Sequence, residues 1–99
     1  MSKKVGDNSK AVERIRDLTG LGPKSEQMLA QIGVNSAEDF LAADPFLLYA
    51  QFKLHSMSVS VNLLYAMIGA QEGHHWQEIA QSRREEILIR LDDMGLAPK

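Results

Sequence analysis

The chain contains no cysteine, so neither a disulfide nor a thiolate metal site can hold its fold together. No stretch approaches the roughly 20 consecutive apolar residues that a membrane-spanning helix needs. The polar segment Met1–Asn8 has two lysines but no apolar run behind them, which is unlike a secretory signal. The sequence therefore predicts a cytoplasmic protein that does not enter a membrane and that is stabilised by apolar packing and helix capping.

An excess of positive charge is also missing, because 11 Lys and Arg face 13 Asp and Glu, giving a net charge of -2. Strong nucleic-acid binders use many Lys and Arg against phosphates, so this balance argues against one. The charge is unevenly placed, with six bases and three acids up to Lys24 and five bases and ten acids after it. Any anion-binding surface should lie near the N-terminal end; the alternative is an ordinary solvated surface.

The 99 residues, 44% of them hydrophobic, are enough for one core and too few for two. We expect an all-α fold, a compact bundle of about five short helices with a hairpin element near its N-terminus. The expected organisation is a flexible tail over residues 1–8, a single helical domain over 9–96 and a tail over 97–99.

Two helices are predicted in the first third of the chain. The first runs from about Ser9 to Leu18, where apolar residues recur every third position. The second begins at Pro23, a residue suited to the first helical position, and ends at Gly33. Val34 should then contact Leu29, as in a Schellman motif.

Capping signals predict two more helix starts. Ser36 is followed by Asp39 in the manner of a capping box, and the Asp44-Pro45 pair starts a helix that continues to about His55.

The next helix starts at Ser58 or Ser60 and runs to about Ala70. It is apolar on nearly every side, so it should be the central buried helix, and a charge at Leu64 should unfold the domain.

The last helix is predicted from Ser82, with Glu85 completing a capping box, to Gly95, with Leu96 placed against Leu91. An i,i+4 ion pair between Glu86 and Arg90 is expected on its outer face.

The most specific local motif is the Gly-x-Gly turn in Leu18–Ser25. Glycines allow a tight turn that exposes backbone N–H groups, and these amides, the following helix dipole and Lys24 would together hold a phosphate oxygen. The arrangement resembles a helix-hairpin-helix DNA-binding element. Residues that would contact nucleic acid are Gly20, Gly22, Lys24, Ser25, Lys10, Arg14 and Arg16.

Two considerations oppose the nucleic-acid interpretation of this turn. Glu26 stands where the hairpin family usually has a small residue, and its carboxylate weakens attraction for phosphate. The turn could instead be only a tight corner between packed helices, with Leu21 inserted into the core. Structural anchors are expected at Leu21, Leu64, Tyr65 and Trp76.

No catalytic or metal-binding set is apparent. His74 and His75 lie near Glu78, but adjacent histidines point in different directions and no third ligand has a suitable spacing. A structural turn anchored by Trp76 is the preferred interpretation. We expect no enzyme activity, no catalytic residues, no metal and no cofactor.

Two blocks of sequence resemble the C-terminal domain of the TfoX/Sxy competence-regulator family, over about Ile15 to Leu96. The first block is 18–29 with 32–34 and 37–39, and the second is 62–66 through 72–76. The resemblance implies a bacterial helical domain involved in transcriptional regulation of DNA-uptake genes, acting with a transcription activator. The N-terminal domain of the full-length regulators is absent here, so the chain is expected to be a stand-alone homologue or a fragment.

Two functions follow as alternatives. The first is a regulatory domain that contacts DNA weakly through phosphates at the hairpin. The second is a protein-interaction or homodimerisation module without DNA contact. Its acidic remainder and exposed apolar surface around Tyr49, Phe52 or Trp76 would engage a basic partner or a second copy of the chain.

Overall fold

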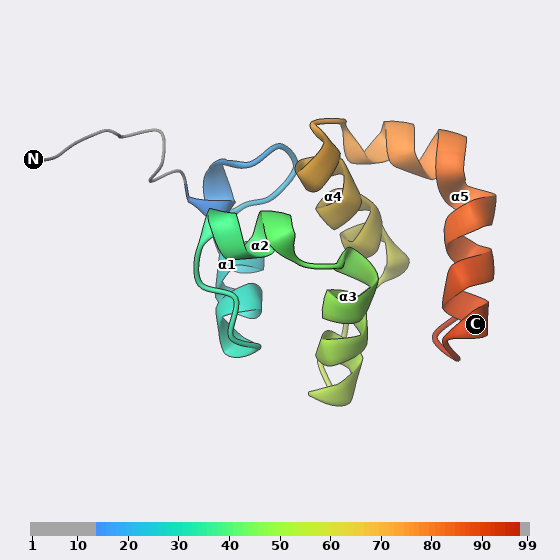
Figure 1. The fold of residues 1–99 in the computed structure, drawn as a ribbon, viewed down its shortest axis with the longest axis horizontal. Helices are drawn as coiled ribbons and strands as arrows, with labels where there is room; N and C mark the ends of the chain where they lie inside the picture. The colour runs from blue at the N-terminus through green and yellow to red at the C-terminus, as the bar shows by residue number, and fades with distance from the viewer. Residues whose placement is uncertain (1–13, 98–99) are drawn as a thin grey trace, which may run out of the picture.

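The computed structural model describes residues 14–97, which form one short 3₁₀ helix, five α-helices and no strand (Figure 1). The elements are η2 (Ile15–Asp17), α1 (Pro23–Gln31), α2 (Ala37–Ala42), α3 (Pro45–Leu54), α4 (Val61–Glu72) and α5 (Trp76–Asp93). The prediction of an all-α fold with about five helices is confirmed. The predicted tail over residues 1–8 lies outside the described residues, as do residues 98–99. No described helix has both the length and the apolarity needed to cross a membrane.

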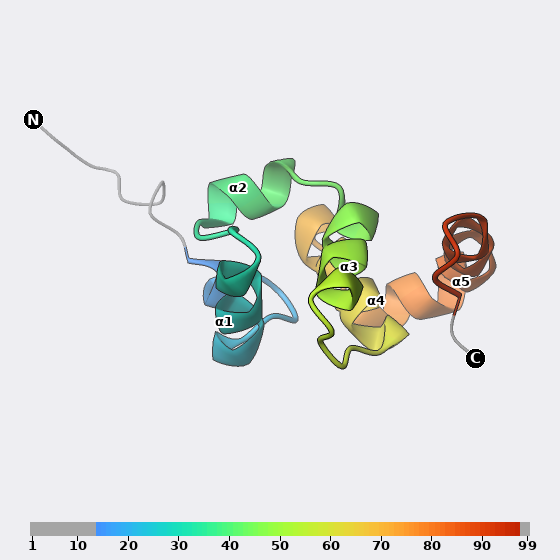
Figure 2. The ribbon, with the colours of Figure 1, turned by 90° about the horizontal axis from the view of Figure 1, so that it is seen from below.

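Helix α4 is the central helix of the domain, as its uniform apolarity predicts. It lies between α3 and α5, while η2, α1 and α2 form the end of the molecule away from α5 (Figures 1 and 2). Leu64 and Met67 are 0% exposed and Ile68 is 2% exposed. Gly69 lies so close to the backbone carbonyl of His74 that a side chain at this position would collide with it. The start of α5 is therefore packed directly onto the last turns of α4.

The predicted helix ends are confirmed. Gly33 adopts φ +91°, and the Val34 amide donates to the Leu29 carbonyl at 2.9 Å, which is the Schellman arrangement. The Leu96 amide donates to the Leu91 carbonyl at 2.8 Å in the same way after Gly95.

The predicted starts of α2 and α3 are confirmed as well. The Ser36 hydroxyl accepts a hydrogen bond from the Asp39 amide at 3.0 Å, and the Asp44 carboxylate accepts one from the Phe46 amide at 2.9 Å. Each side chain satisfies an N–H group that the helix itself cannot pair.

The continuous helix predicted over residues 9–18 is wrong in the part that can be compared. Only Ile15–Asp17 is helical, and the flanking Arg14 (ψ 155°) and Leu18 (ψ 150°) are both extended. The Asp17 carboxylate accepts from the Arg14 amide at 3.3 Å, a local side-chain contact that competes with helix continuation. Residues 9–13 of the prediction lie outside the described residues.

The predicted start of the last helix at Ser82 is also wrong, because α5 begins at Trp76. The ring Nδ1 of His75 accepts from the Gln77 amide at 3.1 Å, so a histidine occupies the capping position. The Ser82 hydroxyl instead donates to the Glu78 carbonyl at 2.6 Å, one turn back within the helix. Serines bonded in this way often accompany helix bending, and Figures 1 and 2 both show α5 bent along its length.

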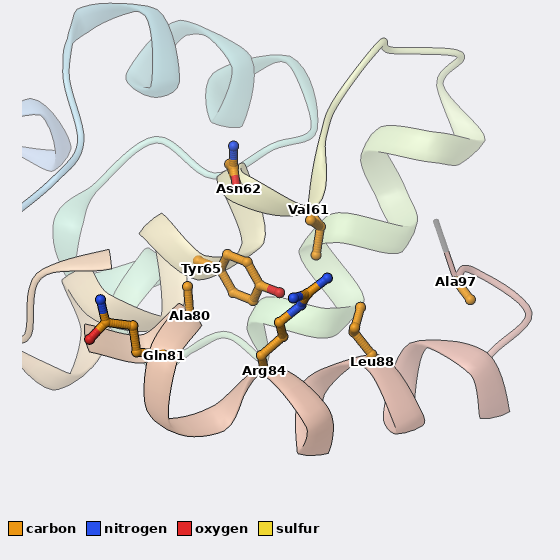
Figure 3. Close-up of a pocket in the computed structure, with 8 residues that line it drawn as sticks. All are labelled: Val61, Asn62, Tyr65, Ala80, Gln81, Arg84, Leu88 and Ala97. Atoms are coloured by element: carbon orange, nitrogen blue, oxygen red, sulfur yellow. The ribbon is translucent and has the colours of Figure 1, made fainter. Parts of the chain in front are cut away.

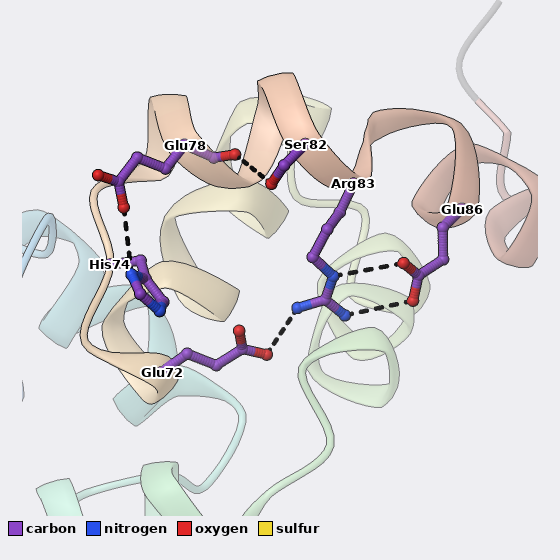
Figure 4. Close-up of polar contacts among 6 residues, drawn as sticks. All are labelled: Glu72, His74, Glu78, Ser82, Arg83 and Glu86. Carbon is purple, nitrogen blue, oxygen red and sulfur yellow. Dashed lines mark hydrogen bonds and ion pairs between the residues drawn. The ribbon is translucent and has the colours of Figure 1, made fainter.

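The expected Glu86–Arg90 pair does not form, because both residues have other partners. Glu86 pairs with Arg83 at 3.4 Å, and Arg83 also reaches Glu72 on α4 at 2.7 Å (Figure 4). Arg90 pairs with Asp44 at 2.9 Å, and its guanidinium lies 4.1 Å from the centre of the Phe46 ring. The contacts of Arg83 with Glu72 and of Arg90 with Asp44 connect α5 to α4 and to the start of α3, while the Arg83–Glu86 pair runs along α5 itself.

His75→Ala should destabilise the domain by roughly 0.5–2 kcal/mol, the usual cost of removing a helix cap. His75→Asp, which keeps a capping acceptor, should restore most of this loss. Urea unfolding followed by circular dichroism measures both. Ser82→Ala is the matched control: a larger loss of stability for Ser82→Ala than for His75→Ala would contradict the cap at His75.

Candidate functional site

The Gly-rich corner between η2 and α1 has the tight geometry that its sequence indicates. Gly20 adopts φ +80°, a conformation that side chains other than glycine rarely take, and the Leu21 amide donates to the Leu18 carbonyl at 3.1 Å. Leu21 is 8% exposed and belongs to the core. This burial is consistent with the role predicted for Leu21 as an anchor of the corner.

The first turn of α1 presents unpaired backbone donors. Gly22 caps this helix without a side-chain hydrogen bond, and Pro23 has no N–H to offer. The first helical hydrogen bond joins the Glu26 amide to the Gly22 carbonyl at 3.0 Å, which leaves the amides of Lys24 and Ser25 without an acceptor within residues 14–97. Lys24 is exposed beside them. Two N–H groups, the positive end of a helix dipole and one ammonium group are therefore gathered at this corner.

Glu26 determines how much positive charge the corner can offer. Its Oε1 accepts from Arg16 Nε at 2.9 Å and from Arg16 Nη2 at 2.7 Å, and the same oxygen accepts from Arg14 Nη2 at 3.1 Å. Its Oε2 accepts from the Arg16 amide at 3.4 Å. The Glu26 side chain is 18% exposed, so α1 is joined to η2 by a carboxylate surrounded by two arginines.

This network changes the interpretation of the predicted nucleic-acid residues. Gly20, Gly22, Lys24 and Ser25 lie together at the corner, but Arg14 and Arg16 are already paired with Glu26. Lys10 lies outside the described residues. Sequence reasoning recognised Glu26 as unfavourable for phosphate, and the structure supplies the mechanism: the carboxylate pairs with both arginines and offsets one of their two positive charges.

The predicted exposed aromatic surface is wrong for two of its three residues. Tyr49 and Phe52 are each 1% exposed, because they lie on the side of α3 that packs into the core. Burial raises the pKa of the Tyr49 hydroxyl above its ordinary value. Trp76 is half-buried against the core at the start of α5 and stacks with His75.

The apolar surface that α3 does expose lies on its opposite side. Leu47 is 58% exposed and Leu54 is 76% exposed, and their spacing of seven residues places them on the same face. Gln51 lies between them and is exposed, and Ala50 is partly exposed. We refer to Leu47, Ala50, Gln51 and Leu54 as the α3 stripe. The signal in the sequence was a helix with apolar residues on both faces, of which only one can enter the core.

The two adjacent histidines have local structural partners. His74 Nδ1 lies 3.1 Å from Glu78 Oε1 (Figure 4), and His75 caps α5. Among the residues that the structure describes, no three His, Asp or Glu side chains are grouped so that they could hold a metal ion.

The fold is thus a small all-α domain in which a Gly-rich corner precedes a buried central helix. The family model of the TfoX C-terminal domain matches residues 11–91, so the chain belongs to the TfoX C-terminal domain family. No curated protein and no solved structure matches the chain.

The Glu26 network should make stability depend on pH. The hydrogen bond from the Arg16 side chain lowers the pKa of the Glu26 carboxyl below its ordinary value of 4.5, although desolvation opposes the shift. A lowered pKa in the folded state stabilises the protein above the ordinary value, and this contribution is lost as the pH falls through the lowered one. Glu26→Gln should therefore reduce the melting temperature at pH 7 and have much less effect near pH 3.

Thermal unfolding at the two pH values measures this difference. Glu85→Gln, on the exposed side of α5, is the matched control for loss of one carboxylate. An equal effect of Glu26→Gln at both pH values would show that the ion pairs contribute nothing to the folded state.

Proposed function

We propose that this protein is a regulatory binding domain that acts by docking onto another protein through the α3 stripe. The observation that carries the proposal is the exposure of Leu47 and Leu54 on one face of α3. Burial of a leucine side chain contributes about 1.5–3 kcal/mol, so two such residues can act as the anchors of an interface. An amphipathic or apolar helix face laid against a partner is a common mode of protein recognition.

The charge around the stripe supports a protein partner over a nucleic acid. Lys53 is the only charged residue of α3, and its ammonium lies 5.4 Å from the centre of the Tyr49 ring. A surface with two large apolar side chains and one cation provides little attraction for phosphates.

The regulatory role rests on family membership. We propose that the domain takes part in transcriptional regulation of competence genes and that its partner is a transcription activator. The proposal involves binding without catalysis and without a cofactor, in the cytoplasm. A second copy of the chain at the same stripe is the alternative occupant.

A photo-crosslinking residue at position 54 should capture a discrete partner in the host cell, because Leu54 is the most exposed large apolar residue of the described chain. The same residue at position 85, on α5, is the control and should capture no partner of that mass. Adding Leu47→Ser to the position-54 variant should reduce the yield severalfold. Equal capture from positions 54 and 85 would contradict the α3 stripe, and a product of twice the chain mass would identify a homodimer.

A second candidate function is weak contact with DNA phosphates at the Gly-rich corner. The specific observation in its favour is the pair of unpaired amides, at Lys24 and Ser25, next to the Lys24 ammonium. Such contact would be sequence-independent and sensitive to salt, with a Kd on the order of 10⁻⁴ to 10⁻⁶ M.

Fluorescence anisotropy of a labelled duplex at low and physiological salt tests the second candidate. Lys24→Glu should weaken binding at least severalfold, because it places a carboxylate at the unpaired amides. Glu26→Gln should strengthen binding, because it releases Arg14 and Arg16 from their ion pairs. Absence of binding by the wild-type protein at low salt, or identical affinities for all three proteins, would exclude the corner as a DNA contact.

A further inference from the structure

A pocket of about 590 Å³ lies between the first turns of α4 and the middle of α5 (Figure 3). Its volume is within the range of about 300–1,000 Å³ that is usual for small-molecule sites. Val61, Ala80 and Leu88 supply its apolar wall, and Tyr65 and Arg84 supply polar groups. Among the residues that the structure describes, no Asp or Glu lines it.

Arg84 differs from the other arginines in its lack of an acidic partner. Within residues 14–97, Arg14, Arg16, Arg83 and Arg90 each pair with a carboxylate at 3.4 Å or less, whereas Arg84 forms no such pair. Its side chain extends into the pocket from α5 (Figure 3). A guanidinium placed over an apolar wall is a ready donor for an anion.

The Tyr65 hydroxyl is a second unused donor in the same pocket. Tyr65 is 4% exposed, and its ring enters the pocket from α4 with the hydroxyl directed toward the Arg84 side chain (Figure 3). The hydroxyl forms no hydrogen bond with any group in the described part of the chain. The hydroxyl opens onto the pocket, so it is available to donate a hydrogen bond to an acceptor bound there.

The beginning of α4 adds a favourable potential for an anion. Val61 and Asn62 are the first two residues of this 12-residue helix and both line the pocket. Ser60 precedes them without a side-chain capping hydrogen bond. The first turn of α4 therefore borders the pocket, and the amides of Val61 and Asn62 have no acceptor within residues 14–97, which leaves a positive potential near the pocket.

We propose that this pocket binds a small organic carboxylate. The carboxylate lies between Arg84, the Tyr65 hydroxyl and the start of α4, and its apolar body lies on Val61, Ala80 and Leu88. One guanidinium and one helix terminus match a single negative charge, and the planar guanidinium matches a carboxylate in shape. The pocket is separate from both the Gly-rich corner and the α3 stripe, so this proposal does not depend on the proposed function.

Binding of hexanoate to the full chain, followed by ¹H–¹⁵N NMR titration, tests the proposal. Hexanoate should shift the Arg84 side-chain signal and the amides of Val61 and Asn62, and neither hexanol nor acetate should match its affinity. Arg84→Gln should weaken binding roughly tenfold or more, and Tyr65→Phe severalfold, because each removes a donor to the carboxylate. Ala80→Leu should weaken binding without any change in charge, because it fills the apolar part of the pocket.

Arg83→Gln is the matched control, because it removes the same charge from the adjacent position of α5 outside the pocket. Circular dichroism establishes that each variant is folded. The proposal is overturned if the wild-type protein does not bind hexanoate at millimolar concentration, or if Arg83→Gln weakens binding as much as Arg84→Gln. Tighter binding of hexyl phosphate than of hexanoate would overturn the assignment of a carboxylate.

Discussion

The burial of α4 is the constraint on which the other contacts of the domain depend. Leu64 and Met67 are completely buried, and Gly69 allows the backbone at His74 to pass within a distance that no side chain would permit. Because α5 starts immediately after this close approach, the position of α4 also sets the position of Trp76 and of the pocket between the two helices. A helix that is apolar on all sides is stable in water only when neighbouring elements cover its surface, and α3 and α5 provide this cover.

A single carboxylate has two effects at the other end of the molecule. Glu26 joins α1 to η2 through Arg14 and Arg16, and in doing so it offsets one of the two positive charges that these arginines could present to a phosphate. The ion pairs that hold α1 to η2 therefore also weaken the attraction of this corner for a phosphate. Formation of the Gly-rich corner does not require DNA contact, because Leu21 in the core already explains the tight turn.

The three surfaces of interest arise from different physical causes. The Gly-rich corner offers amides because the first turn of any helix leaves them unpaired. The α3 stripe exists because a helix with apolar residues on both faces can bury only one of them. The pocket lies between α4 and α5, where the short side chains of Ala80 and Val61 form part of its wall and Arg84 and Tyr65 extend into the space.

The sequence by itself determined the helical class, the ends of α1 and α5, the starts of α2 and α3, the central place of α4 and the tight turn at Gly20. Each of these depends on a side chain or glycine acting within a few residues, or on the periodicity of a single segment. Tertiary structure alone decided which face of α3 is buried, which carboxylates Arg83 and Arg90 pair with, and that Arg14 and Arg16 both pair with Glu26. The physical reason is that these features depend on contacts between segments distant in the sequence, which no local pattern encodes.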